Sequence, residues 1–360
     1  MDFKNLIRRE VMEVEGYPVE VEPHPIKLDA NEFPYSAGDD LQQELLEAAR
    51  SLPFNRYPDP QARELRETAG RALGLPPDML LIGNGSDELI QLLLIALSGG
   101  RPKVLIPHPT FAMYEIASAH LGFKVIRVPL KSDFDLDLAK ILRRLNRSSP
   151  RAIFISYPNN PTGNCFSRAA MLEIIKLAPG LVVVDEAYFN FCGRSFIPHL
   201  EEFSNLAVLR SLSKVGLAGL RVGILIAHPK LIGLLAKVKL PYNVGLFPQR
   251  MAMAALENKG IIDRRVKQVI EERERLARAL ADLPGIHPFP SEANFILFRL
   301  EGRADEVHRL LLEKGISIKN LNRVESLKDC LRVTIGRPEE NQTFLKALSD
   351  IIRDRLGETS

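Results

Sequence analysis

The sequence predicts an α/β protein: a large domain on a mostly parallel central sheet with helices on both faces, then a smaller α+β domain. From about residue 79 to residue 227, short apolar runs alternate with helical segments, which is typical of a parallel sheet covered on both faces. After Pro284 the order becomes strand, helix, strand, strand, helix, which indicates a separate mixed domain. A length of 360 residues suits two such domains.

The first thirty residues read as an extended arm that packs on another part of the protein. They contain a short amphipathic piece, then Gly16-Tyr17-Pro18, with further prolines at positions 23 and 25. We therefore predict an N-terminal arm over residues 1–30, a large domain over residues 31–262 and a small C-terminal domain over residues 263–360.

Within the large domain, the helices follow from apolar spacing and the strands from uninterrupted apolar runs. The segment before the first strand predicts two helices, and the one after the last strand predicts a long helix with an interruption at Lys259-Gly260. The helices are expected over 41–51, 62–73, 85–97, 111–119 and 248–283. The strands are expected over 79–82, 103–106, 123–128, 152–156, 181–184, 206–209 and 222–227.

The small domain is predicted from the same signals. Strands are expected over 293–298, 316–319 and 330–335, and helices over 304–314 and 339–356. The strand at Leu181–Val184 is the most uniformly apolar in the chain, as a parallel strand buried on both faces should be.

Composition excludes several classes of function. The hydrophobic fraction is 46% and the charged fraction 26%, as in ordinary globular proteins, and a formal net charge of +3 gives no basis for a nucleic-acid or membrane surface. Three well separated cysteines form neither a disulfide framework nor a metal cluster, so we expect no metal and a cytoplasmic location. No apolar run is long enough for a membrane span.

Chemically capable side chains gather where the predicted strands end. Because ligands of parallel sheets bind at the carboxyl ends of the strands, these side chains are expected to meet. Lys214 could form a Schiff base, and nearby hydroxyl groups with Arg221 could hold a phosphate, the two features that pyridoxal 5'-phosphate (PLP) requires. The residues at these ends are Asn160, Asp185, Tyr188, Ser211, Ser213, Lys214 and Arg221. Taken alone, the stretch around Lys214 fits a surface loop with capping serines equally well.

Two other segments have a structural and a functional reading. Gly83–Glu88 leads into a helix whose first amides suit an anion, but it also fits a glycine-rich turn capped by Ser86 or Asp87. Phe111 fits a core residue or a ring stacked on a flat cofactor. The strand ending at Asp185-Glu186 resembles a magnesium-binding strand of a P-loop ATPase, but the chain lacks the Gly-Lys pair that such a loop needs.

Several motifs together resemble the fold-type I PLP-dependent aminotransferases. They are Tyr-Pro-Asn-Asn-Pro-Thr-Gly at 157–163, Val-Val-Asp-Glu-Ala-Tyr at 183–188 and Ser-Leu-Ser-Lys at 211–214. Within that family the chain is similar to the histidinol-phosphate aminotransferases, through the motifs at 29–32, 56–59, 83–88 and 217–221. The resemblance covers nearly the whole chain and implies transamination between L-histidinol phosphate and 2-oxoglutarate in histidine biosynthesis, by a ping-pong route.

The resemblance implies a role for each residue at the cofactor ring. Lys214 is expected to bind the cofactor aldehyde and then to move the substrate α-proton, which requires a pKa well below about 10.4. Asp185 is expected to pair with the ring nitrogen and keep it protonated. Asn160 and Tyr188 are expected to bond the ring oxygen, with Asn160 also reaching the substrate, and Phe111 to stack on the ring.

The resemblance also implies a phosphate site, a substrate site and a partner subunit. The cofactor phosphate is expected on Ser211, Ser213, Arg221 and the helix start formed by Gly85, Ser86 and Asp87. Tyr57 is expected to reach the phosphate in the neighbouring subunit, so a homodimer with shared sites follows. Arg332 is expected to bind the substrate α-carboxylate with two hydrogen bonds. Tyr17 is expected to help close the pocket.

Three positions depart from the family pattern. The interval from Lys214 to Arg221 is seven residues, whereas many relatives have eight. Phe33 stands where the family usually has a second asparagine. Lys319 stands where the family commonly uses an arginine for the substrate phosphate, and Arg323 could supply the missing donors.

Three alternatives remain beside the leading hypothesis. The same fold serves aromatic amino-acid aminotransferases and threonine-phosphate decarboxylases, and Lys319 discriminates between a phosphorylated and an aromatic substrate. A third alternative is a non-catalytic PLP-binding regulator, but no helix-turn-helix module precedes the aminotransferase-like region.

Overall fold

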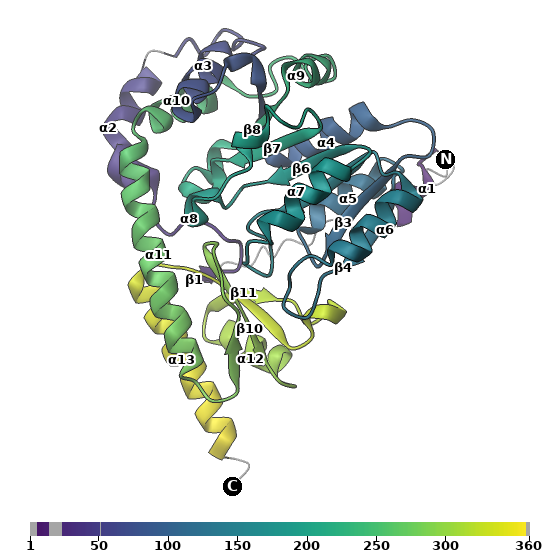
Figure 1. Ribbon diagram of the computed structural model, residues 1–360. Coiled ribbons are helices and arrows are strands. Elements are labelled where there is room, and N and C mark those ends of the chain that lie inside the picture. The colour runs from purple at the N-terminus through teal and green to yellow at the C-terminus, as the bar shows by residue number, and fades with distance from the viewer. Residues whose placement is uncertain (1–5, 14–23, 51, 358–360) are drawn as a thin grey trace.

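The strands of the protein form two separate sheets in the computed structural model, which describes residues 6–13, 24–50 and 52–357 (Figure 1). In the larger sheet β4, β3, β5, β6 and β7 run parallel, and β8 runs antiparallel to both of its neighbours. In spatial order the strands are β2 (Leu80–Asn84), β8 (Val222–Ala227), β7 (Leu206–Ser211), β6 (Leu181–Asp185), β5 (Ala152–Ser156), β3 (Lys103–His108) and β4 (Lys124–Pro129). The predicted mostly parallel sheet is confirmed.

Helices cover both faces of this sheet because alternate residues of each strand point to opposite sides. Ile153 and Ile155 of β5 belong to one apolar cluster, whereas Phe154 between them belongs to another. The first cluster includes residues of α3 (Arg63–Leu73), α6 (Leu138–Ser148), α7 (Arg168–Leu177) and α10 (Leu246–Glu257). The second includes residues of α4 (Gly85–Leu97), α5 (Ala112–His120) and α9 (Pro229–Leu235).

The smaller sheet combines the C-terminal region with a strand from the N-terminal arm. Its strands, in spatial order, are β1 (Ile26–Leu28), β11 (Ile316–Asn320), β12 (Cys330–Thr334), β10 (Phe295–Leu300) and β9 (Ile286–Pro288). β1 pairs in parallel with β11, so that Leu28 lies beside Ile318. This pairing gives a structural place to the part of the arm that the sequence reads only as extended.

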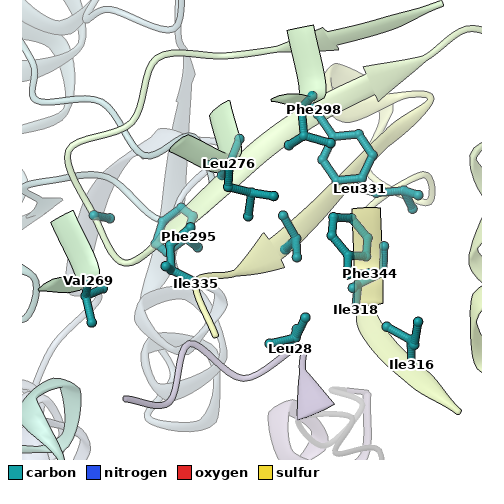
Figure 2. Packing of buried hydrophobic residues seen from close by; sticks show 14 of the residues in the cluster. Leu28, Val269, Leu276, Phe295, Phe298, Ile316, Ile318, Leu331, Ile335 and Phe344 are labelled. Carbon is teal, nitrogen blue, oxygen red and sulfur yellow. The ribbon is translucent and has the colours of Figure 1, made fainter. Parts of the chain in front are cut away.

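Three helices pack on the small sheet. Two are long, α11 (Lys259–Ala281) and α13 (Pro338–Gly357), and one is short, α12 (Ala304–Glu313). Figure 2 shows Phe295, Phe298 and Leu331 from the sheet packed with Leu276 of α11 and Phe344 of α13. The same apolar cluster continues to Tyr188 and Val215. The core of the small sheet is therefore continuous with residues that border the site described below.

The remaining helices of the described residues are α1 (Arg9–Glu13), α2 (Ala37–Arg50) and α8 (Phe189–Cys192), and α2 packs on α10. The break predicted at Lys259-Gly260 falls at Asn258, between α10 and α11. α11 is continuous through position 262, where the sequence division ends the large domain, and that division stays a prediction (Figure 1). None of the described helices has both the length and the apolar composition to cross a bilayer.

Candidate active site

A pocket of about 340 Å³ opens where three parallel strands end. Ser156, Asp185 and Ser211 are the last residues of β5, β6 and β7, and all three line it. Of the residues singled out in the sequence, twelve line this pocket, including Asp185 and Ser211. They are Ser86, Asp87, Phe111, Asn160, Asp185, Tyr188, Ser211, Ser213, Lys214, Arg221, Lys319 and Arg332. Side chains from both sheets therefore meet in one cavity.

Asp185 presents a buried carboxylate at the floor of this pocket. The Tyr114 hydroxyl donates to its Oδ2 at 2.7 Å, and the amide of Ala187 donates to its Oδ1 at 3.0 Å. Burial raises the pKa of Asp185 to about 6, and the two hydrogen bonds oppose that rise. The carboxylate is consequently held in the pocket at an energetic cost, ready for a cationic partner.

Lys214 follows β7 in the short turn Ser213–Val215. Its Nζ lies 3.5 Å from the carbonyl oxygen of Ala30 and 5.8 Å from the centre of the Tyr188 ring. Burial, followed by the positive charge of Arg332, lowers the pKa of Lys214 to about 8. At pH 7 roughly a tenth of the amine would then be neutral, so a nucleophilic amine is available near neutral pH.

Arg221 joins the turn after β7 to the start of α4. Its guanidinium donates to Ser213 Oγ and to Asp87 Oδ2, both at 3.1 Å. Arg221 adopts the left-handed conformation with φ of 51°, and it lines the pocket, seven residues after Lys214. Gly85 has a φ of 78°, a left-handed conformation that favours glycine, and a Cβ atom there would lie 2.5 Å from the Arg221 guanidinium and displace it.

The helix start beside Arg221 differs from the capped turn that the sequence allowed. α4 begins at Gly85 with Asn84 as its N-cap residue, which makes no side-chain capping bond. The Glu88 carboxylate instead accepts the Asn84 amide at 2.5 Å. Neither Ser86 nor Asp87 is the cap; both line the pocket. The positive end of α4, the hydroxyl groups of Ser211 and Ser213 and the guanidinium of Arg221 thus form a cup suited to a phosphate.

Arg332 and Lys319 bring two positive charges from the small sheet. They are direct partners across β12 and β11. Arg332 donates to Asn160 Oδ1 at 2.5 Å and to the Asp29 carbonyl at 2.7 Å, and its guanidinium carbon lies 5.2 Å from the centre of the Phe295 ring. These contacts fix the buried guanidinium, and both cations also border an adjoining pocket that includes Arg323.

Tyr188 and Phe111 supply the aromatic walls. Tyr188 accepts a hydrogen bond from Asn31 Nδ2 at 2.9 Å and meets the Phe295 ring edge to face, with ring centres 5.3 Å apart. Phe111 precedes α5 and meets Tyr114 edge to face at 5.4 Å. Phe111 is partly exposed to the pocket rather than enclosed in the core, which favours its reading as a wall of the site.

Two residues considered in the sequence lie elsewhere, and a third is not among those that the structure describes. Tyr57 is 80% exposed and stacks on Tyr242, with ring centres 4.6 Å apart, and it does not line the pocket of its own chain. Tyr17 lies outside the described residues. Phe33 packs on Phe191 and borders a different, much smaller pocket.

The sequence analysis did not assign a role to several residues of the pocket. Asn31 belongs to a motif that it quoted, and the side chain turns out to bond Tyr188. Tyr114 lies three residues after Phe111, one turn along α5, which is the signal that could have identified it. The others are Lys27, Asp29, Ala30, Met113, Ser156 and Ala187.

A comparison with known families decides what this arrangement belongs to. The profile described as aminotransferase class I and II matches residues 23–348. The chain belongs to this aminotransferase family. The enzyme is 47% identical to "Histidinol-phosphate aminotransferase 2" of Nitrosococcus oceani, over 95% of this chain and 96% of that protein. It is 40% identical to "Histidinol-phosphate aminotransferase" of Aquifex aeolicus, over 97% and 98% of the two chains.

A solved structure shares the fold of this aminotransferase. It is the histidinol-phosphate aminotransferase of Sinorhizobium meliloti in complex with pyridoxal-5'-phosphate, with a TM-score of 0.86, 23% identity, and coverage of 96% of this chain and 97% of that one. The fold-type I prediction is confirmed, and membership of this aminotransferase family supports the predicted cofactor PLP. The pocket fits that cofactor chemically, because it offers an amine, a buried carboxylate, an aromatic wall and a phosphate cup.

Proposed function

We propose that this aminotransferase transfers the amino group of L-histidinol phosphate to 2-oxoglutarate, as a step of histidine biosynthesis. The pairing of Lys319 with Arg332 across neighbouring strands carries the proposal. Glutamate presents its α-carboxylate next to the reacting carbon, whereas histidinol phosphate presents a phosphate ester that reaches one methylene and one oxygen further. Two adjacent cations can therefore serve the two anionic groups in turn.

In this proposal the bound PLP supplies an electron-withdrawing ring that stabilises charge at the substrate α-carbon. Lys214 holds the cofactor through its Nζ and, once released, takes the proton from the α-carbon. Asp185 holds the proton on the ring nitrogen. The cup of Ser211, Ser213, Arg221 and the amides at Gly85 holds the cofactor phosphate, while Asn160 and Tyr188 orient the ring oxygen and Phe111 covers the ring.

Substrate binding is proposed to bring the small domain onto the pocket. Arg332 is already bonded to Asn160 of the large domain and to the Asp29 carbonyl. A substrate carboxylate that replaces one of these partners would neutralise the charge of Arg332. Because that charge lowers the pKa of Lys214, its neutralisation would change the pKa of the amine. Closure also excludes water from the reacting carbon. The contribution of Tyr17 and the cytoplasmic location stay predictions.

The test of the proposed function is a panel of three amino donors with 2-oxoglutarate: histidinol phosphate, phenylalanine and threonine phosphate. We expect glutamate to form from histidinol phosphate with a kcat/KM about 10- to 150-fold above that for phenylalanine, because a buried charge-assisted contact contributes about 1.5–3 kcal/mol. Preference for phenylalanine would identify an aromatic aminotransferase instead. Release of CO₂ from threonine phosphate would identify a decarboxylase.

Lys319→Ala is expected to raise KM for histidinol phosphate by about 10- to 100-fold and to leave KM for glutamate nearly unchanged. The reason is loss of one charge-assisted bond to the phosphate while Arg332 keeps the α-carboxylate. Steady-state kinetics in both directions measures the two constants. Lys328→Ala is the matched control, because this exposed lysine of the same domain lines neither pocket. Unchanged turnover of histidinol phosphate by Lys319→Ala would remove the phosphate assignment.

We further propose that the enzyme is a homodimer whose two sites share residues. The support is an exposed apolar group on two neighbouring loops and the start of α10. Its members are Phe54, Tyr57, Leu240, Tyr242 and Phe247. The Lys239 ammonium group donates to the Pro60 carbonyl at 2.8 Å and so ties the two loops together. An exposed apolar cluster of this kind supports an interface with a second chain, and sedimentation at the mass of a single chain would contradict the proposal.

The role of Tyr57 predicts a complementation between two defective variants. Tyr57→Phe is expected to weaken cofactor binding about tenfold, and Lys214→Ala to abolish activity. At a PLP concentration well below the wild-type Kd, Tyr57→Phe has about a tenth of the wild-type occupancy. When the two variants are then mixed and allowed to exchange subunits, each hybrid contains one site with both residues intact, so activity should rise to about a quarter of the wild-type value. A mixture no more active than Tyr57→Phe alone would show that Tyr57 does not act across subunits.

A further inference from the structure

Tyr114 has no part in the motifs that identified the site, yet it contacts Asp185 directly. Its side chain is fully buried, and its hydroxyl donates to Asp185 Oδ2 at 2.7 Å from α5. This contact joins a helix on one face of the large sheet to the last residue of β6. Within the described residues, the other hydrogen bond to this carboxylate comes from the amide of Ala187 to Oδ1.

Neighbouring groups hold the Tyr114 ring in one orientation. The ring of Phe154 stacks on it with centres 5.3 Å apart and planes 12° apart, and Phe111 meets it edge to face. Ser118 Oγ donates to the Tyr114 carbonyl at 2.6 Å. Burial and the charge of Asp185 raise the pKa of the Tyr114 phenol well above its usual value, so the hydroxyl stays protonated and donates.

We propose that Tyr114 is a positioning residue that fixes the Asp185 carboxylate and keeps it ionised, so that the cofactor ring nitrogen keeps the proton between them. This rests on the proposed function, because it concerns the PLP-bound enzyme. A carboxylate and a ring nitrogen in a buried site can exist as an ion pair or as two neutral groups. A hydrogen bond donated to the carboxylate favours the ion pair. Without it, the proton moves toward Asp185 and the ring loses electron-withdrawing power.

Tyr114→Phe tests the proposal, since it removes the hydroxyl and keeps the ring. The probe is PLP labelled with ¹⁵N in the ring and bound to the enzyme at pH 7.5, and the readout is the ring ¹⁵N chemical shift. We expect the signal to move toward the value of neutral pyridine, and kcat to fall about 10- to 100-fold with little change in KM. Tyr157→Phe is the control, because Tyr157 is equally buried and its ring meets Phe196. Its backbone amide donates to the Asp185 carbonyl at 2.8 Å, a contact that the substitution keeps, and no side-chain bond joins it to the Asp185 carboxylate within the described residues.

A wild-type ring ¹⁵N shift in cofactor-bound Tyr114→Phe would overturn the inference, whatever its activity. Thermal unfolding of the apo variant checks that the fold is intact. If the phenylalanine variant does not fold, 4-aminophenylalanine at position 114 provides a weaker donor of similar size, which should give an intermediate shift. An unchanged shift there would also count against Tyr114. Failure of the wild-type protein to bind PLP would instead remove the proposed function and leave the contact purely structural.

Discussion

Lys214→Ala is expected to lower transamination by about 10⁴-fold or more while the protein still binds PLP. The loss combines two effects: the covalent attachment disappears, and the α-proton loses its base, which alone contributes about 10²- to 10⁴-fold. Cofactor binding should persist because the cup around Arg221 and Ser213 does not depend on the lysine. Glutamate formation measures the rate, and the absorbance that remains after gel filtration measures the bound cofactor.

Small amines provide the sharper half of this experiment. If Lys214 acts as the base, added methylamine should restore part of the activity in proportion to its concentration, because it can enter the pocket and take the proton. Lys176→Ala is the matched control, since Lys176 is an exposed residue of α7 and should leave the rate unchanged. Activity above a hundredth of wild type in Lys214→Ala without added amine would assign the base to another residue.

The parallel part of the fold could be predicted because its information is local. β5 has the predicted bounds, as does the antiparallel β8, and β6 and β7 extend the predicted strands by one and two residues to Asp185 and Ser211. Each of the parallel strands β5, β6 and β7 is an apolar run whose last or following polar residues lie at the sheet's carboxyl edge. The rule therefore places Asp185, Ser211 and Lys214 near one another without any knowledge of tertiary contacts.

The rest depended on contacts that the sequence does not display. β1 was not identified because three residues become a strand only through pairing with β11, nearly three hundred positions later. The hydrogen bond from Asn31 to Tyr188 likewise joins residues that are 157 positions apart in the sequence, so no local pattern indicates it. Tyr57 has its proposed function only in an assembly. Two helices that were not predicted, α6 and α7, did carry local signals. Asp137 and Ser167 cap them by accepting hydrogen bonds from the amides of Lys140 and Ala170.

Asp185→Ala is expected to cost at least about 10³-fold in kcat, whereas Tyr188→Phe should cost only about tenfold. The hydroxyl of Tyr188 contributes a single hydrogen bond, worth about 0.5–1.5 kcal/mol. The carboxylate of Asp185 decides whether the ring nitrogen is charged, and each unit of pKa corresponds to about 1.4 kcal/mol. Steady-state kinetics with histidinol phosphate compares the two variants. A larger effect from Tyr188→Phe would contradict the role given to the ring nitrogen.

The same carboxylate should make the apo protein less stable than a neutral variant at neutral pH. Asp185 has a folded-state pKa of about 6 against an ordinary value of 3.8. Because the folded state binds this proton more tightly than the unfolded state, the contribution of Asp185 to stability falls as pH rises from about 4 to about 6. At pH 7 the accumulated cost is about 3 kcal/mol.

Asp185→Asn removes this titration, so its free energy of unfolding relative to wild type should rise by about 2 kcal/mol between pH 4.5 and pH 7, because about 1 kcal/mol of the cost is already present at pH 4.5. Urea unfolding of both apo proteins at several pH values measures the difference, and subtraction cancels the titration of the other carboxylates. With PLP bound, the wild-type protein should become the more stable of the two. A protonated ring nitrogen compensates the buried charge of Asp185, whereas the neutral side-chain amide of the variant forms no ion pair with it. A pH-independent difference between the apo proteins would mean that Asp185 carries no unfavourable charge, and the stored cost that favours cofactor binding would be absent.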